Sequence, residues 1–231
     1  MSEQPSEAEK KELLHYLTGF VSENKKQLFD KVIQNRTRYL TVVIEDLFQP
    51  HNISAVLRTC DCFGIQDVHI IENRNRFEVN PDIALGSSKW LTIHRYNSGK
   101  DTVLNAINQL KNSGYRIVAA TPDINNRTLT EFFPDSKTAL LFGTELQGLS
   151  QPALTNADEL IRIPMFGFTE SFNISVSVAI ILHALTEKLR ASAISWQLGD
   201  DEITDIKLDW VKNVVKRVDL FEQRFRSRKN F

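Results

Sequence analysis

The chain has 231 residues, of which 42% are hydrophobic and 25% are charged, and its formal net charge is −1. These values are ordinary for a globular protein and argue against wholesale disorder, while the near-neutral charge gives no sign of a nucleic-acid partner. The longest apolar stretch, residues 174–185, is too short and too often interrupted by serine and histidine to span a membrane. Cysteines spaced like Cys60 and Cys62 rarely form a disulfide, and there is no second pair for a metal site. We therefore expect a reduced cytoplasmic protein without a metal.

The predicted elements divide the chain into three parts. Residues 1–38 are polar, and leucine and phenylalanine recur there at helical spacing, which predicts a helical extension. Residues 39–191 alternate short apolar segments with helical ones. The expected strands are residues 40–44, 68–71, 117–121, 139–142 and 159–163, and the expected helices are residues 53–63, 102–113, 152–157 and 174–191. This alternation is typical of an α/β fold with a parallel sheet flanked by helices.

The last part, residues 192–231, predicts an amphipathic C-terminal helix whose polar face is basic. Between Lys212 and Phe231 there are seven lysine and arginine side chains against two acidic ones. A basic end on a neutral chain fits binding to a polyanion such as RNA. A solvated helix without a ligand is the simpler alternative, since basic tails are common.

The first motif follows the first strand. Pro50 interrupts the chain there, Asn52 is placed to cap the next helix, and Gly64 is placed to end it. At about 100° per residue, Arg58 lies nearly opposite the apolar stripe of this helix. Arg58 is therefore expected to point out of the core near the carboxyl edge of a strand, where ligands bind in open α/β sheets. Taken alone, these residues could be an ordinary helix cap and an ordinary surface charge.

The second motif is Gly-x-Glu-x-x-Gly, formed by Gly143, Glu145 and Gly148 directly after a buried strand. Gly143 allows a sharp bend or a close approach to a ligand, and Gly148 allows a positive φ angle. The run lacks the Gly-Lys-Ser/Thr ending of a phosphate-binding loop and matches the dinucleotide fingerprint poorly. It predicts a pocket floor, with an ordinary turn as the alternative.

The third motif lies between a strand that stops at Pro164 and a long apolar helix. Ser171 and Asn173 can cap this helix, whose start offers free backbone N–H groups and a partial positive charge. Small residues follow at positions 175, 177 and 179, which permits close packing against another backbone. A capped core helix would explain the cap, but not the cluster of polar residues before it.

Each motif is weak alone, but in this order they resemble the SpoU branch of the SPOUT superfamily, a group of RNA ribose 2′-O-methyltransferases. The family pattern Asn-x5-Arg is matched by Asn52 and Arg58. Strand-Gly-x-Glu-x-x-Gly is matched at residues 143–148, and Ile-Pro-Met followed by Ser-Leu-Asn-Val-Ser is matched at residues 163–175. Phe172 stands where the family usually has leucine, which keeps an apolar wall.

The resemblance implies a parallel α/β sheet with a C-terminal trefoil knot, a homodimer, and S-adenosylmethionine as cofactor. It also implies a tRNA substrate, with guanosine 18 of the D-loop as the expected target. The expected catalytic residues are Asn52, Arg58, Glu145, Ser171 and Asn173. The expected cofactor-binding residues are Thr121, Gly143, Gly148, Ile163, Met165 and Phe172. The expected RNA-binding residues are Arg36, Arg38, His51, Lys216, Arg224, Arg226 and Arg228.

In such a site we interpret Arg58 as the group that stabilises the attacking ribose oxygen, because a guanidinium effectively never loses its proton in a protein. The proton acceptor stays open between an RNA phosphate and Glu145. Alternatives are the same chemistry at another tRNA position or on ribosomal RNA, and a non-catalytic RNA-binding relative. A nucleotide-binding oxidoreductase is disfavoured by the absent dinucleotide fingerprint.

Overall fold

The computed structural model of the chain describes residues 5–47, 49–73, 84, 86–98, 101–144 and 147–229, with the backbone alone for 228 and 229. The chain divides into two compact units. The sheet unit consists of residues 37–196, and the helical unit combines residues 1–36 with residues 197–231. The two ends of the chain, expected as separate extensions, therefore share one unit.

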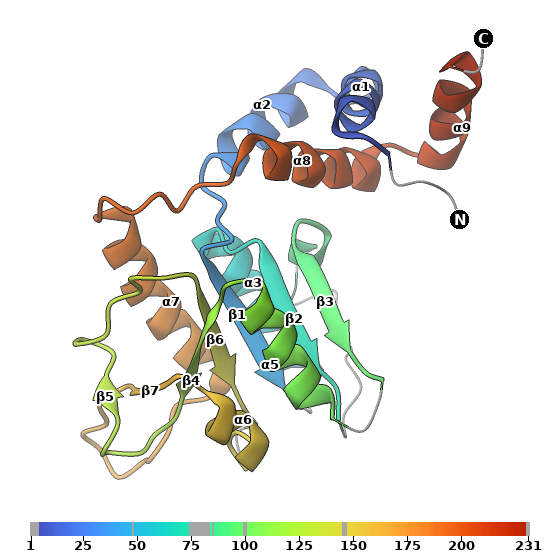
Figure 1. Cartoon of the computed structure of the whole chain (residues 1–231). Helices are drawn as coiled ribbons and strands as arrows, with labels where there is room; N and C mark the ends of the chain where they lie inside the picture. Colours follow the sequence, from blue (N-terminus) through green and yellow to red (C-terminus); the bar gives the residue numbers. More distant parts are fainter. Residues whose placement is uncertain are drawn as a thin grey trace. The chain divides into compact units, whose positions relative to one another are not determined.

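The sheet unit is built on a parallel sheet with the strand order β3-β2-β1-β6-β4-β7-β5 (Figure 1). The strands are β1 (Leu40–Glu45), β2 (Asp67–Ile71), β3 (Thr92–Tyr96), β4 (Arg116–Ala120), β5 (Arg127–Thr128), β6 (Thr138–Phe142) and β7 (Glu159–Arg162). Every pairing between neighbouring strands is parallel. The carboxyl ends of all these strands therefore lie at one edge of the sheet.

Helices cover both faces of this sheet (Figure 1). α3 (Pro50–Phe63) and α7 (Ile174–Arg190) pack against each other on one face. α5 (Thr102–Asn112) and α6 (Gln151–Asn156) cover the other face. A 3-10 turn, η1 (Ser87–Lys89), precedes β3 and packs near α3.

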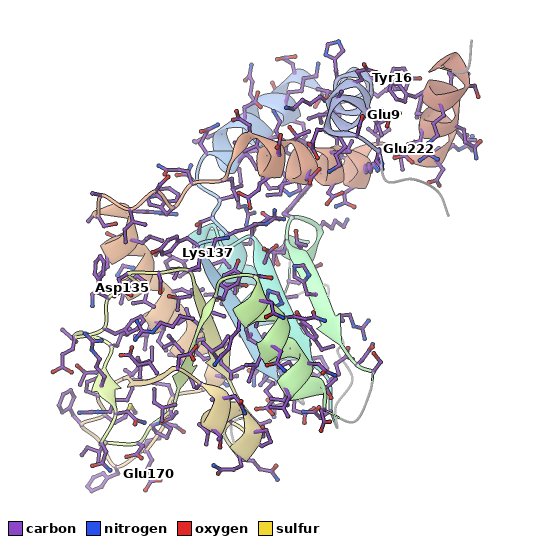
Figure 2. All side chains as sticks on the ribbon, in the orientation of Figure 1. Glu9, Tyr16, Asp135, Lys137, Glu170 and Glu222 are labelled. Atoms are coloured by element: carbon purple, nitrogen blue, oxygen red, sulfur yellow. The ribbon has the colours of Figure 1, made fainter. Side chains whose placement is uncertain are left out.

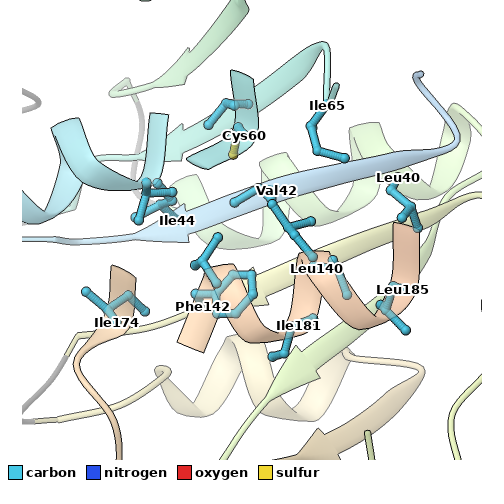
Figure 3. Packing of buried hydrophobic residues seen from close by; sticks show 14 of the residues in the cluster. Leu40, Val42, Ile44, Cys60, Ile65, Leu140, Phe142, Ile174, Ile181 and Leu185 are labelled. Atoms are coloured by element: carbon cyan, nitrogen blue, oxygen red, sulfur yellow. The ribbon is translucent and has the colours of Figure 1, made fainter. Parts of the chain in front are cut away.

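Two apolar cores result, because successive side chains of a strand point to opposite faces. Val42 of β1 belongs to the core under α3 and α7, and its neighbour Val43 belongs to the core under α5 and α6. Figure 3 shows the first core, in which Phe142 of β6 lies near Ile174 and Ile181 of α7. These buried strands read in the sequence as continuous apolar runs, which is what sheets covered on both faces require.

The expected strands and helices of this unit are confirmed, with ends that differ by a few residues. Two strands were not expected. β3 is a half-buried edge strand with the polar sequence TIHRY, and β5 has two residues, so neither carries the apolar signal on which strand prediction depends. No helix in the described part of the chain is long and apolar enough to cross a membrane. The trefoil knot stays a prediction.

The helical unit contains α1 (Glu7–Thr18), α2 (Glu23–Ile33), α8 (Asp200–Val214) and α9 (Val218–Lys229). α8 packs against both α1 and α2, and α9 packs against α1. Trp210 of α8 is 2% exposed and contacts the ring of Phe29. The prediction of one C-terminal amphipathic helix is wrong, because the chain turns between α8 and α9, where Arg217 adopts a φ angle of +56°.

A histidine pair lies at the β3 side of the sheet. The rings of His69 and His94 stack with their centroids 4.5 Å apart, and His69 Nδ1 lies 3.0 Å from the Tyr96 hydroxyl. Asp67 contacts His94 at 3.5 Å. Burial and the charge of His94 lower the pKa of His69 to about 4, although Asp67 acts in the opposite direction.

The buried His69 makes stability depend on pH. The folded-state pKa of His69, about 4, lies below the unfolded value of about 6.5. Between these two pH values the unfolded state binds the proton more readily than the folded state. We expect the free energy of unfolding to fall as the pH is lowered from 6.5 to 4, by on the order of 3 kcal/mol from this residue at the limit. The free energy of unfolding, measured by urea titration at several pH values over this range, should depend more steeply on pH in wild type than in His69→Gln. His183→Gln, on the exposed side of α7, is the control. Parallel stability profiles for wild type and His69→Gln would contradict the assignment.

Candidate active site

The three sequence motifs come together at the carboxyl edge of the sheet. α3 follows β1, the 143–148 loop follows β6, and the 163–173 segment follows β7. β1 pairs with β6, and β4 lies between β6 and β7. Because all these strands are parallel, segments far apart in the sequence end at the same place.

A hydrogen bond between two asparagines joins the first motif to the third. Asn173 caps α7, and its Oδ1 accepts hydrogen bonds from the Ser175 backbone N–H at 2.9 Å and the Ser175 hydroxyl at 2.7 Å. Its Nδ2 donates to Oδ1 of Asn52 at 3.2 Å. Asn52 is 2% exposed, and its own Nδ2 donates to Oε1 of Gln49 at 3.2 Å. The two expected catalytic asparagines are therefore in contact.

The expected capping role of Asn52 is wrong. The N-cap of α3 is Gln49, because Pro50 takes the first helical position and places Asn52 inside the first turn. The Asn52 amide instead joins the N-cap residue Gln49, to which its Nδ2 donates, to Asn173, from which its Oδ1 accepts. Gly64 does end the helix in the left-handed conformation, with a φ angle of 78°, as predicted.

Arg58 lies on the exposed side of α3. It follows Asn52 by six residues, which is roughly 9 Å along a helix axis. Among the described residues, no hydrogen bond or ion pair involves its guanidinium, so the structure does not bring Arg58 into the asparagine network. Arg58 is therefore an exposed residue of the helix that begins at the site.

The 143–148 loop folds back tightly on itself. Thr144 and Gly148 exchange two backbone hydrogen bonds of 3.0 Å, and Gly148 has a φ angle of +66°. A Cβ atom on Gly143 would lie 2.2 Å from the backbone of Gly148, so only glycine fits there. The expected positive φ angle of Gly148 is confirmed, while the close approach at Gly143 is to the backbone of Gly148. Glu145, an expected catalytic residue, lies outside the described residues.

These loops surround a cavity of about 450 Å³. All the residues expected to bind the cofactor border it, together with Ser171: they are Thr121, Gly143, Gly148, Ile163, Met165 and Phe172. Apolar side chains of Leu149, Leu154, Ile161 and Ile181 form much of the remaining wall. Three separate loops thus line one open cavity.

The charge of this cavity restricts its ligand. Glu170 is the one charged side chain among the described residues that line it, and no lysine or arginine is among them. Figure 2 labels Glu170 at the end of the sheet unit where the strands stop. Sites for phosphate groups usually supply cationic or helix N-terminal donors. The cavity is better suited to a ligand with an apolar or aromatic body and a positive charge.

A polar network that the sequence did not reveal supports one wall of the cavity. Oγ1 of Thr121 accepts a hydrogen bond of 2.7 Å from Nδ2 of Asn126, and Nε of Arg162 donates to the Asn126 carbonyl at 3.0 Å. No motif spacing links these residues, since Arg162 comes from β7 and the other two from the loop after β4. The pairing of β7 with β4 on one side and with β5 on the other brings them together.

Glu45 at the end of β1 contacts the chain just after the 143–148 loop. This carboxylate is 3% exposed and accepts a hydrogen bond of 2.9 Å from the Ser150 backbone N–H. The Ser150 hydroxyl in turn caps α6. Beside Glu45, a second cavity of about 570 Å³ is acidic, with Asp46, Glu72 and Asp101 also in its lining, so it does not suit a polyanion.

The expected RNA-binding residues occupy different environments. Arg36 is 2% exposed and its guanidinium lies 5.4 Å from the centre of the Trp210 ring, so it is part of the packing of the helical unit. Arg38 is half-buried, and its Nε lies 3.0 Å from Oδ2 of Asp67 at the amino edge of the sheet. Neither arginine is placed on an open surface at the candidate site.

The other expected RNA contacts are exposed where they are described. His51 is exposed in the first turn of α3, directly before Asn52. Lys216, Arg224 and Arg226 are exposed in the helical unit. The side chain of Arg228 lies outside the described part. Of the basic side chains of α9 that the structure describes, Arg224 and Arg226 are therefore both exposed.

The fold and the cavity agree with one family. The model of the SpoU rRNA Methylase family matches residues 39–183, and the chain belongs to this family. It is 42% identical over 211 residues to the tRNA (guanosine(18)-2'-O)-methyltransferase of Borreliella burgdorferi, which covers 91% of this chain and 95% of the relative. It is 32% identical over 193 residues to the enzyme of the same name from Thermus thermophilus, which covers 83% and 97%.

A solved structure shows a similarity of fold over most of the chain. The A. aeolicus TrmH/SpoU tRNA modifying enzyme matches with a TM-score of 0.75 and 29% identity, over 84% of this chain and 98% of that one. The match therefore reaches beyond the family segment into the additional helices.

The close backbone approach at Gly143 predicts the effect of its replacement. We expect Gly143→Ala to displace the 143–148 loop and to weaken binding of S-adenosylmethionine at least about tenfold, since the added Cβ meets rigid backbone. Gly167→Ala is the matched control, because a Cβ there meets nothing within 4 Å. Calorimetric titration of folded variants checks this, and equal affinities for Gly143→Ala and wild type would contradict it.

Proposed function

We propose that this protein transfers a methyl group from S-adenosylmethionine to the ribose 2′-oxygen of guanosine 18 in tRNA. The observation that carries the proposal is the cavity at the carboxyl edge of the sheet, which is bordered by two family motifs and has no cationic lining among its described residues. Family membership supports methylation of RNA. The names of the relatives support tRNA and guanosine 18.

The residues of the cavity fit this cofactor. S-adenosylmethionine has an aromatic adenine, a ribose, a cationic sulfonium and no phosphate. Ile161 and Ile163 offer an apolar wall to adenine, Thr121 offers a hydroxyl, and the Glu170 carboxylate complements the positive charge. When bound, the cofactor would supply the methyl group of its sulfonium, whose bond to sulfur breaks as the bond to the 2′-oxygen forms and a neutral thioether leaves.

Arg58 is assigned to stabilise the charge that develops on the attacking 2′-oxygen. A ribose hydroxyl is a poor nucleophile at neutral pH, so the site must favour its alkoxide character. The guanidinium keeps its proton and acts as a hydrogen-bond donor and a charge. The hydroxyl proton goes to a second group, and an RNA phosphate and Glu145 are the two candidates.

The asparagines and Ser171 position the reacting groups. Asn52 is buried and held by Asn173, so the start of α3 and the start of α7 are fixed relative to each other. This connection holds the helix that carries Arg58 beside the loop that borders the cofactor. Ser171 borders the cavity two residues before Asn173 and supplies a hydroxyl to the same space.

Binding of the tRNA is assigned to basic side chains outside the cavity. The exposed residues Lys216, Arg224 and Arg226 would contact phosphates, and His51 would lie beside the reacting nucleotide. Arg36 is left out of this role because it is buried, and Arg38 because it pairs with Asp67. As in the family resemblance, we propose a homodimer that acts in the cytoplasm.

Methylation of defined transcripts tests the function. Purified protein is incubated with labelled S-adenosylmethionine and either a tRNA transcript, the same tRNA with adenosine at position 18, or ribosomal RNA, and the modified nucleotide is then mapped. Label at the ribose of guanosine 18 in the first tRNA alone is expected. Label on ribosomal RNA or elsewhere in tRNA would overturn the substrate, and absence of label would overturn the enzyme.

Removal of the Arg58 guanidinium tests the mechanism. We expect Arg58→Ala to lower kcat by about 10²- to 10³-fold, the loss typical when a group that stabilises a developing oxyanion is removed, with S-adenosylmethionine affinity unchanged. Lys137→Ala is the control, since it removes one positive charge before β6, at the amino edge of the sheet (Figure 2). Most of the activity remaining in Arg58→Ala would remove Arg58 from the mechanism.

Charge reversal in the C-terminal helix tests the RNA contacts. Arg224→Glu, Arg226→Glu and Arg228→Glu together should weaken tRNA binding and reduce its salt dependence. Each lost phosphate contact should reduce the log–log salt slope by about 0.9. Filter binding between 50 and 200 mM salt, concentrations over which such slopes are resolved, checks this. An unchanged slope would exclude the helix from the interface.

A further inference from the structure

The segment between Met165 and Ser171 carries two phenylalanines that are almost completely exposed. The exposure of Phe166 is 96% and that of Phe168 is 109% of the reference value. Gly167 between them has open space around it. Single exposed apolar side chains are common, but two bare aromatic rings one residue apart form a surface that is costly to leave in water.

Both ends of this segment belong to the site. Met165 at the start of the segment and Ser171 at its end border the cavity, as does the next residue, Phe172. The chain then continues directly to Asn173, which is bonded to Asn52 in the first turn of α3. A ribose that reaches the cavity therefore brings its own base, or a neighbouring one, next to the exposed rings.

The charges around the site separate two sides for an RNA strand. Residues 164–173 contain one charged side chain, Glu170, and no basic one, so this segment does not suit phosphates. α3, in contact with it through Asn52, presents His51 and Arg58 to solvent. The phosphate backbone is thus favoured on the α3 side, and the bases on the phenylalanine side.

We propose that Phe166 and Phe168 form a stacking platform for an unpaired nucleobase of the RNA substrate, at or next to the nucleotide that is methylated. Sequence-tolerant recognition of unstacked bases by aromatic faces is a general mode of RNA binding. This inference rests on the proposed function for the identity of the RNA. It adds a surface that holds the target strand beside the cavity while the cofactor occupies it.

Two double variants test the platform, because they distinguish aromatic stacking from a general apolar contact. The double variant Phe166→Leu/Phe168→Leu keeps an apolar surface without an aromatic face, and Phe166→Tyr/Phe168→Tyr keeps the faces. We expect the leucine variant to raise the KM for tRNA about tenfold or more, and the tyrosine variant to stay within about threefold of wild type. Affinity for S-adenosylmethionine should be unchanged in both. Phe133→Leu is the control, an exposed phenylalanine (40%) between β5 and β6.

A binding measurement keeps the platform testable apart from the reaction. Fluorescence anisotropy of a labelled single-stranded RNA is measured with the same variants, and a duplex of equal length is the comparison. The platform is supported if the leucine variant binds the single strand more weakly than wild type and the tyrosine variant does not. This holds even if wild type fails to methylate tRNA and the proposed function is wrong. The platform would be overturned if wild type and the leucine variant had equal KM for tRNA and equal affinity for the single-stranded RNA. A lower molar mass of the leucine variant by light scattering would also overturn it, because the rings would then belong to a protein interface.

Discussion

Parallel pairing of the strands is the constraint on which the site depends. Because every strand runs in the same direction, every loop that follows a strand begins at one edge, whatever its place in the sequence. β1, β6 and β7 deliver the three motifs to this edge, and the short sequence distances within each motif fix their local shape. The asparagine pair then ties α3 to α7 across 121 residues. Without the parallel order, Asn52 and Asn173 would not begin their helices at the same edge of the sheet.

The site divides its tasks between rigid backbone and side chains. Glycine at 143 and 148 lets the loop close on itself. The buried carboxylate of Glu45 accepts a hydrogen bond from the backbone N–H of Ser150, directly after the loop. The cavity wall is apolar with scattered hydroxyls, which suits an uncharged adenosine body, while the cationic residues stand outside it on α3 and in the helical unit. Cofactor and polyanion are therefore assigned to surfaces of different polarity, and this separation underlies the proposed reaction.

Much of the fold could be predicted from the sequence because buried parallel strands and amphipathic helices leave strong periodic signals. β1, β6 and α7 are examples, each an apolar run bounded by a breaker or a cap. β3 was not predicted because an edge strand can be polar. The break between α8 and α9 was not predicted because the residue at its turn, Arg217, is not of a type that favours a positive φ angle. The positive φ angle of Gly148 and the cap that Asn173 forms on α7 followed from local chemistry alone, and both were confirmed.

The sequence alone supplied the residues that are expected to carry the chemistry, because glycine, asparagine, arginine and glutamate at motif spacing impose their own local conformations and charges. Tertiary structure decided which of them meet. It placed Asn52 in a hydrogen bond with Asn173 instead of at a helix cap, since Pro50 moved the helix start by one turn. It buried Arg36 against Trp210 and paired Arg38 with Asp67, although both look like free cations in the sequence. Such outcomes depend on contacts between distant segments, and no local pattern encodes those contacts.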